Sequence, residues 1–269
     1  MTAKPTFDAL ARDYDSRFSQ SRTARWLRDQ IHARLAVHFP AGSRVLELGC
    51  GTGEDALRLA RRSVQVVATD ASEAMLDITA AKTKHEPNVT VARLDLRRLP
   101  DPPAPPLDGR FDGAFASFGP LNCLDDWRPL AGWLAARVRP GGLVALGMMS
   151  RFCLWEVGWH GAHGDFKTAT RRLGGSAAFD AGGDCAMVSY PTVARLTRDF
   201  APWFERFAVR PLGLALPTSD AYGAIERQPR LYRALLSVEQ RVRGIGVLAE
   251  FADHYWIEFR RTNEVESSE

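Results

Sequence analysis

Three glycines at alternate positions interrupt the segment VLELGCGTGEDALRLA, which runs from Val45 to Ala60. They stand between a short apolar run of strand-forming residues and a run whose apolar residues have helical spacing. Glycine lacks a Cβ atom, so a ligand is able to approach its backbone closely. A strand, a glycine loop and a helix in this order predict an α/β sheet with a ligand site beyond the carboxyl end of the first strand.

Strand-like and helix-like segments continue to alternate along the chain. This alternation predicts a parallel sheet covered by helices on both faces. An irregular stretch follows, in which Gly, His, Trp and Arg mix without a clear period, and the pattern then resumes. The strand-like segments are residues 44–49, 64–70, 89–95, 111–118, 143–149, 207–216 and 253–261.

The charge of the chain is nearly balanced, with 35 basic and 32 acidic residues, and no dense basic run indicates a nucleic-acid partner. The cysteines form no C-x-x-C pair, so a disulfide framework and a structural zinc site are both disfavoured. The amino-terminal residues lack the apolar core of a signal peptide, and no stretch reaches the ~20 apolar residues that span a bilayer. We therefore predict a cytoplasmic protein without a membrane partner, and leave its oligomeric state open.

Two cofactors bind glycine loops of this kind. The dinucleotide fingerprint is G-x-G-x-x-G, and counting from Gly49 and Gly51 its third glycine would fall at Glu54. A glutamate at the amino terminus of a helix would also repel a pyrophosphate group, which that end of a helix otherwise attracts. The sequence therefore disfavours a dinucleotide.

The segment ELGCGTG instead resembles motif I, E-x-G-x-G-x-G, of the class I S-adenosylmethionine-dependent methyltransferases. VVATDAS, ARLDLRRLP, FDGAFASFGPLN and RPGGLVALG are similar to the later motifs, in the same order. FDALARDYD resembles the F-x-x-x-A-x-x-YD helix of the small-molecule branch. The resemblance implies an α/β, Rossmann-like, seven-stranded and mostly parallel sheet with helices on both faces, an antiparallel last strand and a lid-like insertion after the fifth strand.

We expect a single methyltransferase domain over residues 1–269. Within it, residues 1–40 would form an amino-terminal helical cap and residues 41–149 the cofactor-binding core. Residues 150–190 would form a substrate lid, and residues 191–260 the carboxyl-terminal helices and the last two strands.

The resemblance also implies S-adenosyl-L-methionine as cofactor, S-adenosyl-L-homocysteine as product, and roles for single residues. Glu47 would orient the glycine loop or the methionine part of the cofactor, and Asp70 would bind both ribose hydroxyls. Asp95 would accept a hydrogen bond from the adenine amino group, with the Leu96 backbone against the ring, and Tyr14 would cover the methionine end. The expected cofactor site comprises Tyr14, Glu47, Gly49, Cys50, Gly51, Asp70, Ala71, Met75, Asp95, Leu96 and Ser117.

Several of these residues also have a purely structural interpretation. Glu47 could be a solvated acid at the end of a strand, although it should point away from its neighbours Leu46 and Leu48. Cys50 is interpreted as a small filler of the loop and not as a nucleophile. Met75 is either a core residue of its helix or an apolar contact to adenine.

The irregular stretch contains His160, His163 and Asp165 among glycines, which suggests a loop. Imidazole and carboxylate groups are metal ligands, but this spacing matches no catalytic metal signature, so no metal is predicted. Trp155 and Trp159 have helical spacing and are interpreted as core residues.

Arg171 and Arg172 remain open between a solvated face and a site for a substrate anion. We predict that the substrate pocket is made chiefly by the amino-terminal helix and by the segment from Ser150 to Tyr190, whose side chains mix apolar bodies with polar tips.

The predicted function is methyl transfer to a small-molecule acceptor at N, O, S or C, and bacterial secondary metabolism is one setting that the resemblance allows. Positioning in a dry site supplies much of the acceleration, so no motif names a catalytic residue. The candidates are His160, His163 and Tyr190. The loop SFGPLN lacks the N/D-P-P-Y pattern of enzymes that methylate planar amino groups. The alternatives are a nicotinamide-dependent oxidoreductase, a cofactor-binding module without catalysis, and a methyltransferase acting on macromolecules.

Overall fold

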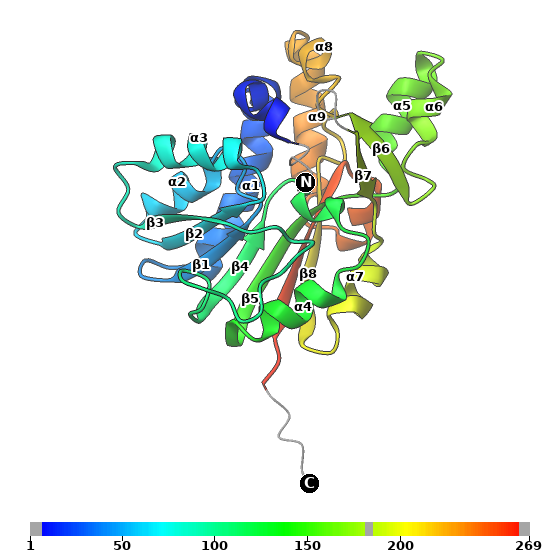
Figure 1. The fold of residues 1–269 in the computed structure, drawn as a ribbon. Coiled ribbons are helices and arrows are strands. Elements are labelled where there is room, and N and C mark those ends of the chain that lie inside the picture. Colours follow the sequence, from blue (N-terminus) through cyan, green and yellow to red (C-terminus); the bar gives the residue numbers. More distant parts are fainter. Residues whose placement is uncertain (1–6, 181–184, 264–269) are drawn as a thin grey trace.

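The structure of the protein is a computed structural model that describes residues 7–180 and 185–263. One seven-stranded sheet with the strand order β3-β2-β1-β4-β5-β9-β8 forms its centre (Figure 1). β9 lies between β5 and β8 and is antiparallel to both, whereas the other neighbouring strands are parallel. The predicted sheet is therefore confirmed, with its antiparallel last strand. Its strands are β1 Arg44–Leu48, β2 Gln65–Asp70, β3 Val89–Arg93, β4 Phe111–Ala116, β5 Val138–Met149, β8 Phe204–Leu212 and β9 His254–Arg261.

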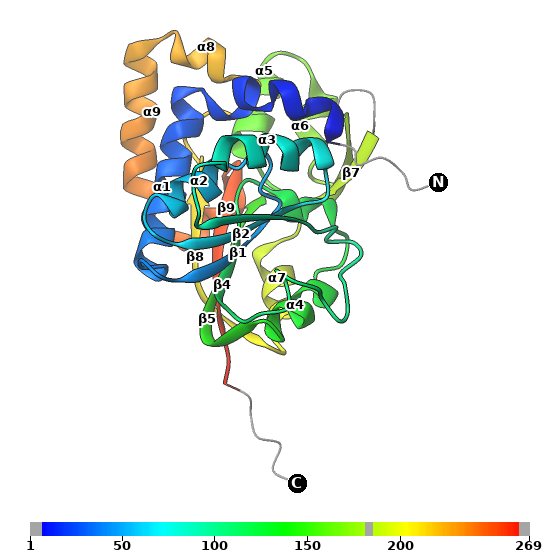
Figure 2. The same ribbon diagram turned by 60° about the vertical axis from the view of Figure 1, so that its left-hand side comes forward.

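Helices cover both faces of this sheet, with α1, α2 and α9 on one face and α4 and α7 on the other (Figures 1 and 2). Alternate residues of each strand point to opposite faces, so that Val45 packs with the first group and Leu46 with the second. No helix within the described residues is long and apolar enough to cross a membrane. The α-helices are α1 Arg22–His38, α2 Glu54–Ala60, α3 Glu73–Thr83, α4 Arg128–Ala135, α5 Leu154–Ala162, α6 Phe166–Thr170, α7 Val193–Phe200, α8 Tyr222–Glu226 and α9 Pro229–Val242.

Shorter turns complete the chain. A 3₁₀ turn (Asp8–Asp13) and a π turn (Asp15–Ser19) precede α1, and two more 3₁₀ turns lie at Pro120–Cys123 and Gly246–Phe251. The Pro-rich segment 100–109 contains no helix or strand, because proline is excluded from helix interiors and central strands. The parallel strands end at the upper edge of Figure 1, where the glycine loop, the loop after β4 and α5 all emerge.

The segment after β5 is more regular than the sequence indicated. It contains α5, α6 and an antiparallel hairpin of β6 (Ser176–Asp180) and β7 (Cys185–Ser189). The loop expected around His160 is wrong, because that residue lies in the last turn of α5. Gly158 and Gly161 lie within this helix, and an added Cβ at either would meet no atom of the described residues within 4 Å, so close packing does not require these two glycines.

Arg172 anchors this segment to the sheet. Its side chain is 4% exposed and bonds to Glu156 and to Asp253, which directly precedes β9. It also donates to the carbonyl of Ser150, where the segment begins. A solvated face is therefore the wrong interpretation for Arg172, and both of its carboxylate partners come from the protein. Arg171 is more exposed and pairs with Glu156.

Candidate functional site

Two glycines of the loop are required by close packing. A Cβ atom on Gly49 would lie 2.3 Å from Cβ of Pro120 in the loop after β4. A Cβ atom on Gly53 would lie 2.6 Å from Cγ2 of Thr79 in α3. Both distances are far below van der Waals contact, so these two glycines let the loop fit between the β4 loop and α3.

Gly51 has a different environment. Its φ is +53°, in the left-handed region, and the nearest atom to an added Cβ is Cε1 of Tyr14, at 3.9 Å. Among the described residues no atom therefore crowds the place of the missing side chain, which leaves room at the loop surface for a ligand. The amide of Gly51 donates to Oδ2 of Asp70, 3.0 Å away, at the carboxyl end of β2.

Asp70 organises the loops on both sides of it. Its second oxygen, Oδ1, accepts from the backbone amide of Ser72, 2.9 Å away. Burial raises the pKa of Asp70, while the amides of Ser72 and Gly51 counteract the rise by stabilising the carboxylate. A carboxylate has about four acceptor positions, so each oxygen keeps capacity for a donor from a ligand.

Glu47 is a buried acid with an unused oxygen. Its side chain lies in β1 at 2% exposure, and Oε2 has no hydrogen-bond partner among the described residues. Burial raises the pKa of Glu47 well above its usual range, and the carboxylates of Asp55 and Asp70 raise it further. Glu47 is therefore not the solvated acid of the alternative interpretation. A hydrogen-bond donor or a cation from a ligand would satisfy its unpaired oxygen and lower the cost of burying it.

Among the described residues, Arg28 of α1 has an unpaired hydrogen-bond donor, whereas Glu47 has an unpaired acceptor. One terminal nitrogen bonds to Asp55 in the first turn of α2, and its guanidinium lies 4.8 Å from the centre of the Phe118 ring. Its Nε is buried and has no partner within the part of the chain that the structure describes. An unpaired acceptor on Glu47 and an unpaired donor on Arg28 thus lie beside the glycine loop.

Sequence reasoning missed Arg28 and its partners. Asp55 also contacts Nε2 of His32 at 2.7 Å. Burial alone would raise the pKa of Asp55, but Arg28 and His32 hold it well below its usual range. Asp55 follows the glycine loop directly and could have been noticed, whereas nothing in the α1 sequence marks Arg28. Only the packing of α1 against α2 brings the two together.

The amino-terminal turns are tied down over the glycine loop. Asp15 accepts from the hydroxyl of Thr52 at 2.6 Å and from Nζ of Lys82 at 2.8 Å. Asp8 accepts from the hydroxyl of Ser72. Tyr14 stands between these ties, and burial raises its pKa. The turns therefore cover the loop at the place where the resemblance puts the methionine end of a cofactor.

The remaining expected cofactor residues lie around the same edge. Cys50 is 8% exposed and burial raises the pKa of its thiol well above the usual range, which disfavours a thiolate nucleophile. Met75 is buried at 2% exposure, and the hydroxyl of Ser117 is buried without a partner among the described residues. Asp95 accepts from the amide of Arg97, at 3.0 Å. Ala71 and Leu96 are partly exposed.

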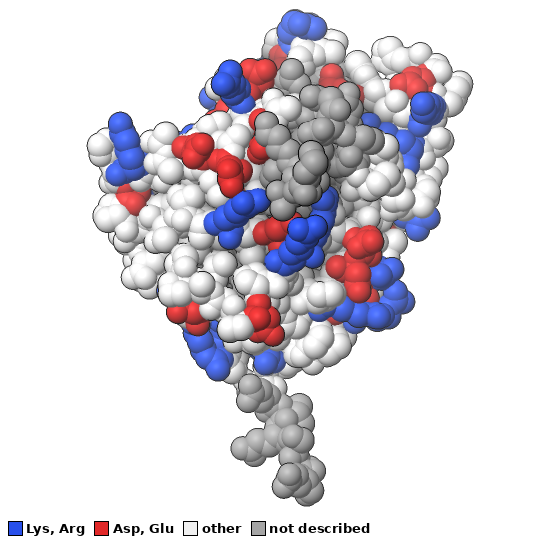
Figure 3. Space-filling view, in the orientation of Figure 1, with Lys and Arg blue, Asp and Glu red and all other residues white. Residues whose placement is uncertain are grey.

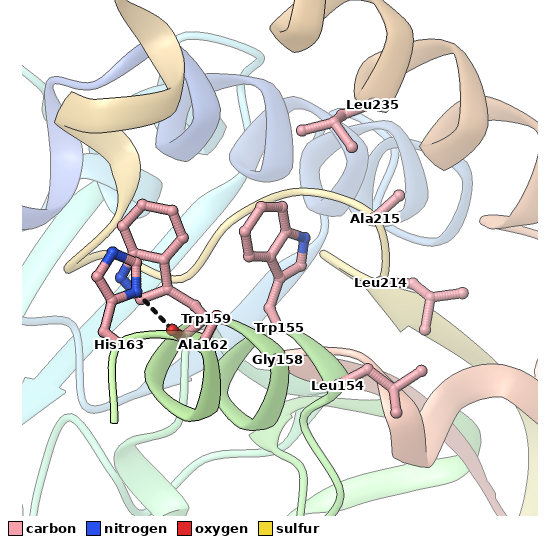
Figure 4. Close-up of a pocket in the computed structure, with 9 residues that line it drawn as sticks. All are labelled: Leu154, Trp155, Gly158, Trp159, Ala162, His163, Leu214, Ala215 and Leu235. Atoms are coloured by element: carbon pink, nitrogen blue, oxygen red, sulfur yellow. Dashed lines mark hydrogen bonds between the residues drawn. The ribbon is translucent and has the colours of Figure 1, made fainter. Parts of the chain in front are cut away.

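A pocket of about 460 Å³ opens between α5, α9 and the chain after β8 (Figure 4). The rings of Trp155 and Trp159 lie on its wall, 6.3 Å apart, and both pack against the buried cluster that includes Trp256 and Leu27. The helical spacing of these tryptophans is confirmed, and they are half-buried pocket walls as well as core contacts. Its lining residues are Leu154, Trp155, Gly158, Trp159, Ala162, His163, Leu214, Ala215 and Leu235.

The three catalytic candidates are not brought together. His163 lines this pocket, with Nδ1 2.7 Å from the Trp159 carbonyl and its ring 4.5 Å from the Trp159 ring. His160 points its Nε2 at Asp220, 2.6 Å away. Tyr190 is buried and lines a different, more polar pocket beside Arg151. Over residues 7–180 and 185–263, no group of three His, Cys, Asp or Glu side chains is arranged to hold a metal ion.

The sequence is similar to known methyltransferases. A family model described as a methyltransferase domain matches residues 45–142. A putative methyltransferase, YqeM of Bacillus subtilis (strain 168), is 28% identical over 154 residues, covering 56% of this chain and 58% of the relative. The 27-O-demethylrifamycin SV methyltransferase of Amycolatopsis mediterranei (strain S699) is 34% identical over 135 residues, covering 48% of this chain and 47% of the relative.

Solved structures extend the likeness to the whole fold. The N-methyltransferase NodS of Bradyrhizobium japonicum WM9, solved with S-adenosyl-L-homocysteine, has a TM-score of 0.58 at 14% identity, over 96% of this chain and 99% of NodS. By sequence, the chain spans about half the length of the curated relatives that it matches.

Proposed function

We propose that this protein transfers a methyl group from S-adenosyl-L-methionine to a small-molecule acceptor, since a family model described as a methyltransferase domain matches residues 45–142. The observation that carries the proposal is the open backbone at Gly51, flanked by the acceptors of Asp70 and by the unpaired groups of Glu47 and Arg28.

The residues at this edge fit the cofactor part by part. Asp70 has acceptor capacity for the ribose hydroxyls. The space beside Gly51 leaves room for the cofactor to approach the main chain of the loop. The free carboxylate oxygen of Glu47 suits an α-ammonium group, and Nε of Arg28 suits an α-carboxylate. This pair matches the two charges of an amino acid.

When bound, S-adenosyl-L-methionine supplies an electrophilic methyl group on a sulfonium centre. The chain's own contribution is to hold that group in line with the acceptor and to keep water out. The amino-terminal turns, held by Asp15 and Asp8, would cover the site. The pocket lined by Trp155 and Trp159 would take an apolar, ring-bearing part of the acceptor.

A small acceptor is favoured over a polyanion by the charge distribution. On the face drawn in Figure 3, Lys and Arg side chains are interspersed with Asp and Glu, so no continuous basic surface follows a nucleic-acid backbone there.

The proposal is tested by incubating the protein with methyl-labelled S-adenosyl-L-methionine and a cell extract. We expect protein-dependent label in the small-molecule fraction. Label in protein or nucleic acid would indicate a macromolecular acceptor, and cofactor that is bound but never consumed would indicate a binding module without catalysis.

Replacing Asp70 with alanine should lower the affinity for S-adenosyl-L-methionine at least tenfold. The change removes a charged acceptor for two hydroxyls, and such hydrogen bonds contribute about 1.5–3 kcal/mol each. Calorimetric titration measures the effect. Asp112→Ala is the matched control, because Asp112 accepts from the Arg44 amide at the opposite edge of the sheet. Equal affinities of wild type and Asp70→Ala would reject this placement of the ribose.

A further inference from the structure

A histidine that the sequence did not single out lies at the carboxyl edge of the sheet. His254 opens β9 and is paired with Met149 at the end of β5 and with Leu212 at the end of β8. Alternate residues of a strand share a face, so His254 lies on the same face as Trp256, which packs against residues of α1. It therefore belongs to the edge where the glycine loop and α5 emerge.

Asp253 fixes the orientation of the His254 ring. Its Oδ2 lies 3.0 Å from Nδ1 of His254, and its Oδ1 accepts from Arg172 at 2.8 Å. The thiol of Cys153 lies 3.9 Å from the same Oδ1. Burial would raise the pKa of Asp253, but His254 and Arg172 hold it well below its usual range, so the carboxylate stays ionised.

This contact selects the tautomer of the ring. Because an ionised carboxylate accepts from Nδ1, the neutral imidazole carries its lone pair on Nε2. No described residue forms a hydrogen bond with that nitrogen, and the side chain is 12% exposed. His254 thus has the arrangement of a general base: one nitrogen held by a buried carboxylate and the other free.

Phe118 connects His254 to the cofactor side of the site. Its ring meets the His254 ring edge to face at 5.8 Å, and the Arg28 guanidinium lies 4.8 Å from the same ring centre. Phe118 has a φ of +53°, a strained conformation for a residue with a side chain, and such strain concentrates at functional sites. One aromatic ring therefore separates His254 from Arg28, which we assigned to the cofactor.

The other histidines near the acceptor pocket are less suited to this role. His160 has carboxylates beside both nitrogens, with Asp220 at 2.6 Å from Nε2 and Asp165 at 3.7 Å from Nδ1. His163 contacts a backbone carbonyl through Nδ1 and is exposed, so no buried charge would stabilise its protonated form.

We propose that His254 is the general base for a methyl acceptor that reacts through a hydroxyl group, with Asp253 as its positioning residue. The inference rests on the proposed function and names its acceptor class. The acceptor oxygen forms a bond to the methyl carbon, the carbon–sulfur bond breaks, and its electron pair stays on sulfur. The hydroxyl proton moves to Nε2 of His254, and the resulting imidazolium pairs with Asp253 until it releases the proton to water.

The charged groups around His254 agree with this role. Asp253 lies on its own chain segment, and Arg172 neutralises the oxygen of Asp253 that faces away from the ring. Tyr222 of α8 interacts electrostatically with Asp253, and Arg28 reaches toward the ring only through Phe118.

The first test uses ¹⁵N-histidine spectra of the wild-type protein, with the His254 signals identified by their loss in His254→Asn. We expect the tautomer protonated at Nδ1. We also expect Nε2 to respond more to S-adenosyl-L-methionine than to S-adenosyl-L-homocysteine, because only the first carries a sulfonium charge. His85, exposed beyond α3, is the internal control and should respond equally to both. The opposite tautomer, or an equal response of Nε2 to both ligands, would overturn the proposal.

The second test compares 2-naphthol with 2-naphthalenethiol as acceptors of the labelled methyl group. The aromatic thiol ionises without help near neutral pH, whereas the naphthol does not. His254→Asn should lower kcat for 2-naphthol at least ~100-fold and change kcat for the thiol by less than about threefold. His85→Gln should change neither. Equal losses on both acceptors, or a wild-type protein that does not methylate 2-naphthol, would contradict the assignment.

Different results would refute the proposed function and the role of His254. If calorimetry detects no binding of S-adenosyl-L-methionine, the proposed function fails and this inference fails with it. If the cofactor binds and the label is transferred, but His254 neither responds in the spectra nor distinguishes the two acceptors, only the role of His254 is refuted.

Discussion

Replacing Arg172 with methionine should destabilise the protein by about 3–5 kcal/mol, because it removes the buried cation that two buried carboxylates share. Glu156 and Asp253 both have side chains less than a tenth exposed, and Arg172 bonds to each of them. Chemical unfolding with urea measures the loss. The segment after β5 should also become a preferred site of proteolysis, since Arg172 ties it to the strand edge.

Arg171→Met is the matched control for this prediction. Arg171 pairs with the same Glu156, but its side chain is 39% exposed, and Arg172 remains beside Glu156 when Arg171 is replaced. We therefore expect a small loss for Arg171→Met and a large one for Arg172→Met. Similar losses for the two variants would show that the buried network does not hold the segment.

Replacing Gly51 with alanine should lower the affinity for S-adenosyl-L-methionine at least ~100-fold, or about 2.7 kcal/mol, while the protein still folds. The added Cβ meets no atom of the described residues closer than 3.9 Å, and we propose that the ligand occupies this space. The left-handed backbone adds a strain of about 1–2 kcal/mol. Valine, which is larger and branched at Cβ, should be worse.

Two other glycines serve as controls for Gly51. Gly141 also has a positive φ, of +73°, and no described atom within 4 Å of an added Cβ, so Gly141→Ala carries the strain without touching the site. It should retain full affinity. Gly49→Ala should instead lose stability, because its Cβ would collide with Pro120. If Gly51→Ala binds the cofactor as well as Gly141→Ala does, the ligand does not lie over Gly51.

The central sheet was predictable because short stretches of sequence indicate each of its strands. Apolar runs of strand length, glycine and proline boundaries and helical spacing indicated all seven strands of the sheet, and the family resemblance supplied the antiparallel β9. The segment after β5 was not predictable in the same way. Its helix α5 carries two glycines, and its anchor, Arg172, is buried only because Asp253 and Glu156 lie opposite it.

The residues of the candidate site also differ in how far the sequence indicated them. The glycine loop and Asp70 stand in a contiguous motif, so the sequence indicated them. Arg28 and His254, which we propose for the site, reach it through tertiary contacts alone, across α1 and β9, and neither lies in a recognisable pattern. The division of the chain at residues 40, 149 and 190 stays a prediction, as do the individual cofactor contacts.

Calorimetric titration of the wild-type protein with S-adenosyl-L-methionine, and separately with nicotinamide adenine dinucleotide, tests the central claim most directly. We expect saturable binding of S-adenosyl-L-methionine at one site per chain, weakened in Gly51→Ala and Asp70→Ala, and no binding of the dinucleotide. Binding of the dinucleotide in its place would contradict the account and make the glycine loop a dinucleotide site.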